Sequence, residues 1–299
     1  MVTQGQILVD DKIADVRPAR RSWRHMRLWR YPDLVVGGVF FAVVVLVVVL
    51  APLLSPYNPA TQNPSDQFAP MSLQHLMGTD DFGRDIFSRI LYGGRPILTI
   101  GVTSIVLAMV VGLIVGVLGG YYRGWIDHAL MALMDLLFSF PFVLLAILVV
   151  TALGPGLVNA IIAISVASIA IFARLARSIV ISLRGMPYVE AAIAAGMGSG
   201  RILWRHILPN LLGPLIVMAT ANLAMAIGYA SALNFLGLGV QPPTPDWGVM
   251  VSDGKQFIYS ALQVPFFPGL AITLTVVSLN FLGDGLQALL DPAGRRGTG

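Results

Sequence analysis

The 299-residue chain contains no cysteine, and only 11% of its residues are Asp, Glu, Lys or Arg. The absence of cysteine excludes disulfides, thiol nucleophiles and Cys-ligated metals. A soluble domain carries about 25% charged residues, so the low charge content excludes an ordinary water-soluble enzyme. A disordered protein is excluded as well, because 56% of the residues are hydrophobic and disorder requires low hydrophobicity with high charge.

Lysine and glutamate, which common catalytic motifs require, are also scarce. Of the two lysines, Lys255 is followed by Gln256, whereas a nucleotide-binding P-loop requires Ser or Thr at that position. The only glutamate, Glu190, is preceded by Val189, so the chain has no His-Glu-x-x-His zinc motif. We therefore expect a chain that is not an enzyme, with no catalytic residue, no cofactor and no metal of its own.

Long uncharged stretches are what the sequence has in abundance. A membrane-spanning helix needs about 20 largely apolar residues, and Gly154-Pro155-Gly156 divides the longest of these stretches in two. The sequence thus predicts an all-α integral membrane protein with six transmembrane helices. The expected spans are Leu34–Leu54, Pro96–Tyr122, two within 129–173, Ile207 to about Leu233, and Pro265 to about Leu282.

The distribution of Lys and Arg predicts the orientation of these spans. Four of the 19 lie in the segments 55–95 and 240–264, and the other 15 lie in the tails, at Arg123 and in the segment 174–206. Cytoplasmic segments carry an excess of Lys and Arg, so both termini are expected in the cytoplasm. The expected parts are cytoplasmic tails 1–33 and 291–299, a transmembrane domain 34–290, outward loops of about 55–95 and 240–264, and a cytoplasmic loop of about 174–206. Residues 1–31 are polar, so no cleaved signal segment is expected.

The cytoplasmic loop has the pattern of two short helices joined by a turn. Alanines favour a helix over residues 188–195, and Gly196, Gly198 and Gly200 end it and allow positive φ. Ser199 is expected to cap the second helix, and Pro209 to stop or kink the chain where it re-enters the membrane. The loop fits either an amphipathic segment on lipid headgroups or a docking knob for a soluble partner, and these residues alone leave both open.

The end of the outward loop, residues 78–95, mixes acidic and basic side chains with apolar ones at helical spacing. This spacing predicts an amphipathic helix at the outer face. Its charges either contact a partner or the mouth of a pore, or pair with one another on a solvated interfacial helix. The charged residues concerned are Asp80, Asp81, Arg84, Asp85 and Arg89.

The second span carries small residues four positions apart, a spacing that lets helix backbones approach closely. The sequence does not say whether the partner helix belongs to this chain. The residues are Ser104, Ala108, Gly112, Gly116 and Gly120.

Several motifs resemble those of ABC-importer permeases. The run Glu190-Ala191-Ala192, then Gly196 and His206-Ile-Leu-Pro209, resembles the EAA motif of these proteins. The segments 78–95, 235–248 and 279–286 look like parts of the C-type permeases of dipeptide, oligopeptide and nickel importers. The resemblance implies the type I ABC-importer permease architecture and a bacterial inner-membrane location.

In that family the EAA loop couples the permease to its ATPase. The resemblance assigns this role to Glu190, Ala191, Ala192, Gly196, Arg201, His206 and Pro209. ATP and Mg would be bound by two partner ATPase subunits, and a second permease, membrane lipid and an extracytoplasmic substrate-binding protein would complete the partners. No nucleic acid is expected. The binding protein would contact the outward segment that carries Asp80 to Arg89.

The transported solute implied by the resemblance is a dipeptide or oligopeptide, with nickel or glutathione as alternatives. A self-sufficient secondary carrier is the alternative from another class. Such a carrier needs an inverted repeat or acidic residues in the middle of its spans, and the sequence shows neither. Residues that bind the solute remain unassigned.

Overall fold

The computed structural model describes residues 31–290, so the basic residues of both tails, on which the predicted orientation depends, lie outside the described residues. The described part is helical, with one isolated bridge between Thr79 and Asp85. Its helices are α1 Pro32–Val49, α2 Ala51–Leu54, η3 Pro64–Asp66, α3 Ile86–Tyr122, α4 Gly124–Ser139, α5 Phe142–Leu153, α6 Leu157–Arg184, α7 Pro187–Ala194, α8 Ser199–Ile202, η4 Leu203–Ile207, α9 Leu208–Phe235, α10 Trp247–Gly254, η5 Lys255–Phe257 and α11 Gln263–Leu290.

Five helices are long and apolar enough to cross a membrane, and a sixth crossing requires that α4 and α5 together form one span. These two helices are bent by 96° relative to each other, so the predicted third span is not one straight helix. Pro141 lacks a backbone N–H and disfavours helical geometry in the residue before it. Phe140 is accordingly extended, with φ −88° and ψ 137°.

Four helices extend beyond the limits predicted from hydropathy. The second span starts at Ile86 rather than Pro96, and the fourth continues to Arg184. The fifth runs with α8 and η4 as one helical stretch, Ser199–Phe235, and the sixth continues to Leu290. Backbone hydrogen bonds satisfy a helix wherever its side chains lie. Hydropathy therefore predicts where a helix leaves the membrane, because charged side chains begin there. It does not predict where the helix ends, since a helix can continue outside the membrane.

The small residues of the second span pack against α6 of the same chain. A Cβ added to Gly112 would lie 2.6 Å from the Cβ atom of Phe172, and Ser104 Oγ donates a 3.1 Å hydrogen bond to the Ile161 carbonyl. Larger side chains would push these two backbones apart. The partner of this face, left open by the sequence, is thus within the chain.

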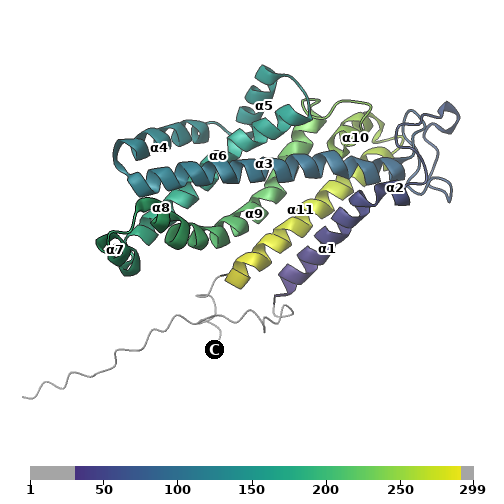
Figure 1. Cartoon of the computed structure of the whole chain (residues 1–299). Coiled ribbons are helices and arrows are strands. Elements are labelled where there is room, and N and C mark those ends of the chain that lie inside the picture. The colour runs from purple at the N-terminus through teal and green to yellow at the C-terminus, as the bar shows by residue number, and fades with distance from the viewer. Residues whose placement is uncertain (1–30, 291–299) are drawn as a thin grey trace, which may run out of the picture.

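The helices form an elongated bundle in which α3 runs along the middle and α1 lies beside α11 (Figure 1). The short helices α7 and α8 protrude at one end, and the segment 55–85 with α10 gathers at the other. These two ends, called the α7–α8 end and the 55–85 end below, are where the residues singled out in the sequence lie.

Candidate functional site

The first helix predicted in the segment 174–206 is α7, Pro187–Ala194, which begins and ends one residue before the predicted range 188–195. Pro187 stands in its first turn, where the missing N–H costs nothing. Glu190 also lies in that turn, where a carboxylate opposes the positive end of the helix dipole. Val189 is fully buried and anchors α7 to the bundle, while Glu190 and Ala191 are exposed. The helix therefore presents its acidic residue outward on a fixed support.

Gly196 ends α7 as predicted. Its φ is +76°, its N–H donates to the Ile193 carbonyl at 2.9 Å, and the Met197 N–H donates to the Ala192 carbonyl at 3.0 Å. These two bonds form a Schellman motif, which needs a left-handed residue at the position of Gly196. The prediction that Ser199 caps the next helix is wrong: Gly198 occupies the cap position, and no side chain caps α8.

The chain re-enters the bundle without a break, contrary to the predicted stop or kink at Pro209. A π-helical segment, Leu203–Ile207, joins α8 to α9, and Pro209 lies in the first turn of α9. Within this segment His206 lies against Tyr188 of α7, with 5.9 Å between ring centroids. The His206 Nε2 atom is buried and has no hydrogen-bond partner in the part of the chain described.

The predicted coupling residues therefore fall into two groups. His206 and Ala192 are half-buried, and the others lie exposed on the protruding turn or at the start of α9. Within residues 31–290, Glu190 and Arg201 form no ion pair with another residue. The exposed residues are Glu190, Ala191, Gly196, Arg201 and Pro209.

Three arginines of α6 fasten the neighbouring helices behind this turn. Arg177 makes a bidentate ion pair with Asp127 of α4, at 2.6 and 2.7 Å, and Arg174 pairs with Asp135 at 2.7 Å. Arg184 donates to the Tyr121 carbonyl at the end of α3. Sequence analysis missed the Asp127–Arg177 pair, because no local signal connects residues 50 positions apart.

At the 55–85 end, the predicted outward segment is a buried turn followed by the start of α3 and not a separate amphipathic helix. Asp80 and Arg89 have only 4% and 3% of their surface exposed. Asp80 accepts from Arg84 Nε at 2.7 Å and lies 3.5 Å from Arg89 Nε, while Arg84 lies 3.7 Å from the half-buried Asp81. The expected internal ion pairs are present, but they are enclosed by protein instead of solvated.

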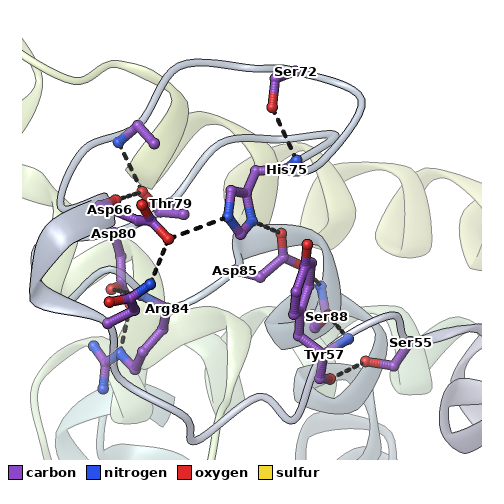
Figure 2. Close-up of polar contacts among 12 residues, drawn as sticks. Ser55, Tyr57, Asp66, Ser72, His75, Thr79, Asp80, Arg84, Asp85 and Ser88 are labelled. Carbon is purple, nitrogen blue, oxygen red and sulfur yellow. Dashed lines mark hydrogen bonds and ion pairs between the residues drawn. The ribbon is translucent and has the colours of Figure 1, made fainter.

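Asp85 connects this charged cluster to the preceding loop. Its side chain caps α3 by accepting from the Ser88 N–H at 2.7 Å, and its other oxygen lies 2.9 Å from His75 Nδ1. Figure 2 shows the His75 ring between Asp85 and Asp66, the second carboxylate lying 3.9 Å away. The ring also stacks on Tyr57 at 4.9 Å. His75 is thus one of the residues that tie the loop to α3, together with Tyr57, whose N–H donates to Ser88 Oγ at 3.3 Å.

Asp246, which sequence analysis did not single out, is fully buried at the start of α10. Its Oδ1 accepts from the Gly248 and Val249 N–H groups, while its Oδ2 has no partner within residues 31–290. Burial raises the pKa of Asp246 to about 6. The adjacent Trp247 donates to the Ile90 carbonyl at 2.9 Å, which fastens α10 to α3.

A hollow of about 180 Å³ lies at the bend between α4 and α5. Phe142 and Tyr229 stack in its wall with 3.9 Å between centroids, and Ser168 and Asn222 contribute polar groups. The sequence carried no signal for it, because the residues come from four helices.

Residues 108–296 match the family of inner membrane components of binding-protein-dependent transport systems, and residues 18–71 match the N-terminal transmembrane domain of oligopeptide transport permease C. The chain belongs to this family. It is 45% identical to a dipeptide transport system permease of Alkalihalophilus pseudofirmus, over 95% of this chain and 92% of that protein. It is 41% identical to a glutathione transport system permease of Pectobacterium atrosepticum, over 92% and 91%.

The fold is similar to that of a solved permease. Two crystal forms of the inward-facing MetNI methionine ABC transporter match with TM-scores of 0.54 and 0.55 and identities of 23% and 24%. The match covers 68% and 69% of this chain, and 97% and 98% of those chains. Family and fold together identify a multi-pass inner-membrane transport component of the type I ABC-importer class, as predicted.

Proposed function

We propose that this chain is one permease subunit of a peptide importer, driven by ATP hydrolysis in two partner ATPase subunits that bind ATP and Mg. The observation that carries the proposal is the exposed turn between α7 and α8, which belongs to a permease fold and protrudes from the end of the bundle (Figure 1). A second, related permease and an extracytoplasmic binding protein complete the assembly.

Coupling would run through the buried support of this turn. Glu190 and Arg201 are exposed and form no ion pair with another residue of 31–290, so they are available to an ATPase surface. Movement of α7 would reach α9 through the Tyr188–His206 contact and α6 through Val189, which is buried in the bundle. The turn would then convert closure of the ATPases into alternating access between the two permeases.

This assignment orients the molecule. The α7–α8 end and both tails would face the cytoplasm, in agreement with the excess of Lys and Arg on that side. The 55–85 end would face outward, toward the binding protein. Four charged residues would lie buried beneath the surface that contacts the binding protein: Asp80, Arg84, Asp85 and Arg89. Asp81, which is half-buried, is the most exposed charge of this set.

A peptide is proposed as the solute because relatives named for dipeptide and di/tripeptide transport cover most of the chain. The relatives named for glutathione transport keep that small peptide as an alternative, and nickel remains a further one. The hollow beside Phe142, Tyr229 and Asn222 has aromatic and amide groups that suit a short peptide.

Copurification tests the proposal. The chain, extracted gently from the cells that naturally produce it, should bring along an ATPase and a second permease, and the reconstituted assembly should take up a labelled dipeptide only with ATP. Gly196→Ala should weaken ATPase retention, because alanine disfavours φ +76°, whereas Gly198→Ala, at φ −64° with open space around it, is the matched control. Uptake by the purified chain alone would contradict the proposal and favour a secondary carrier.

A further inference from the structure

A groove of about 400 Å³ lies between α1 and α3 and is outside the machinery proposed above. Each helix contributes one stripe of residues at helical spacing, so that two apolar walls face each other. The residues that line it are Phe41, Val45, Val48 and Val49 of α1, and Arg95, Leu98, Thr99, Val102 and Thr103 of α3.

Arg95 occupies one end of the groove in a fixed position. Its Nε and Nη2 atoms donate to the carbonyls of Val48 and Val49 at the end of α1, each at 3.2 Å. Its guanidinium also lies 5.0 Å from the Tyr92 ring. A guanidinium has five N–H donors, and these bonds use two of them. No carboxylate pairs with Arg95 within residues 31–290.

The sequence places this charge at a membrane surface. Arg95 is the last charged residue of α3 before the uncharged run 96–122, and Tyr92 precedes it by one turn. Arginine and tyrosine are typical of the interface between headgroups and hydrocarbon. In a bilayer that holds the run 96–122, the lipid phosphates would therefore lie at the level of Arg95.

The length of the groove matches one leaflet of a bilayer. From Arg95 to Thr103 the wall of α3 extends about 12 Å at 1.5 Å per residue, and half of the hydrocarbon core is about 15 Å deep. Helices α1 and α3 diverge from the 55–85 end, where Arg95 bonds to α1, toward the middle of the bundle (Figure 1).

We propose that this groove is a binding site for one phospholipid with an anionic headgroup. The phosphate would accept from the free N–H groups of Arg95, and one acyl chain would lie between Val45 of α1 and Val102 of α3. Charge complementarity selects this occupant over a purely apolar helix of the second permease, since such a helix would leave the Arg95 cation without an anion.

Native mass spectrometry of the full-length chain in detergent tests the proposal, with phosphatidylglycerol, diacylglycerol and glycerophosphoglycerol as probes. Wild type should retain one tightly bound phosphatidylglycerol and bind the other two at least tenfold more weakly, because each lacks either the phosphate or the chains. Retention of diacylglycerol equal to that of phosphatidylglycerol would overturn the proposal.

Two variants test separately how the charge of Arg95 and the space in the groove contribute to lipid binding. Arg95→Gln should weaken phosphatidylglycerol binding about tenfold, with Arg123→Gln, at the opposite end of α3, as the control for loss of one arginine. Thr99→Trp should fill the groove and displace the lipid while leaving the Arg95 bonds to α1 intact, with the exposed Val106→Trp as its control. Unchanged binding in Thr99→Trp would overturn the site even if Arg95→Gln disturbs the fold.

The natural absence of cysteine allows a direct test of the competing occupant. In membranes that hold the assembled transporter, Thr99→Cys labelled with a short photoreactive maleimide should yield adducts with phosphatidylglycerol and none with the second permease. A cross-link to the second permease would instead assign the groove to the interface between the two subunits.

Discussion

At the 55–85 end of the bundle, Asp80, Arg84 and Arg89 are buried and paired with one another, whereas at the α7–α8 end Glu190 and Arg201 are exposed and pair with no residue of 31–290. Buried charges that have internal partners stabilise a shape, because separating them leaves a charge without solvent or counterion. Exposed charges without partners contribute little to folding and remain available to another protein. The two ends should therefore respond in opposite ways to loss of a charge.

The largest effect is expected from Asp80→Ala. Removing this carboxylate leaves Arg84 and Arg89 buried without their shared partner, which costs about 3–5 kcal/mol of the free energy of unfolding. Thermal unfolding of the purified chain in detergent measures it. Asp81→Ala is the matched control, because Asp81 is half-buried and lies 3.7 Å from Arg84, so its loss should cost about 1 kcal/mol or less. If the two variants lose the same free energy of unfolding, the buried ion pairs of Asp80 contribute no more to stability than a surface ion pair does.

The second prediction concerns pH at the same end. Burial raises the pKa of Asp246 to about 6 from 3.8, so the folded chain binds this proton more tightly than the unfolded chain does. The free energy of unfolding should then fall as pH rises between about 4 and 6, by about 3 kcal/mol in all, and stay low above pH 6.

Asp246→Asn tests that contribution. Asparagine keeps an oxygen for the Gly248 and Val249 N–H groups but cannot ionise, so the part of the pH dependence due to residue 246 should disappear. Urea-induced unfolding at pH 4.5 and 7.5 gives the comparison. If Asp246→Asn keeps the full wild-type difference in the free energy of unfolding between pH 4.5 and 7.5, then folding does not raise the pKa of Asp246.

The contrast between the two ends could be predicted only in part from the sequence. Uncharged runs located the spans, and glycine located the turn at Gly196, because hydropathy and positive φ are properties of a few neighbouring residues. Burial of Asp80 and Arg89 could not be predicted, since it depends on how the loop 55–85, α3 and α10 pack together. The Asp127–Arg177 pair and the wall of the α4–α5 hollow are likewise products of tertiary packing.

The predicted ends of the helices were wrong for a related reason. Hydropathy placed the start of the second span at Pro96, yet α3 begins ten residues earlier, at Ile86. The first turns of α3, which carry the buried Arg89, lie against the loop 55–85, and this loop covers them in place of lipid. That part of the helix is surrounded by other segments of the chain and not by lipid.

A smaller stability effect is expected at the turn of the α7–α8 end. Gly196→Ala places a Cβ atom on a residue with φ +76°, which should cost about 1–2 kcal/mol, while Gly198→Ala, at a negative φ, should cost under about 0.5 kcal/mol. Hydrogen exchange at the Met197 amide, which donates to the Ala192 carbonyl, measures the local opening. Faster exchange in both variants would mean that the turn is loosely formed, whatever its φ.

The smallest stability effect is expected from Glu190→Gln, and this variant separates the two ends most sharply. Glu190 is exposed and unpaired within residues 31–290, so the purified chain should unfold within about 0.5 kcal/mol of wild type. Uptake by the assembled importer should nevertheless fall several-fold, because the coupling proposed above requires this carboxylate at the contact with the ATPase. Asp33→Asn, another exposed carboxylate in a first helical turn, controls for loss of one negative charge. Loss of chain stability with Glu190→Gln would place the glutamate in the internal scaffold, and the unpaired charges of that end could then no longer be assigned to a partner.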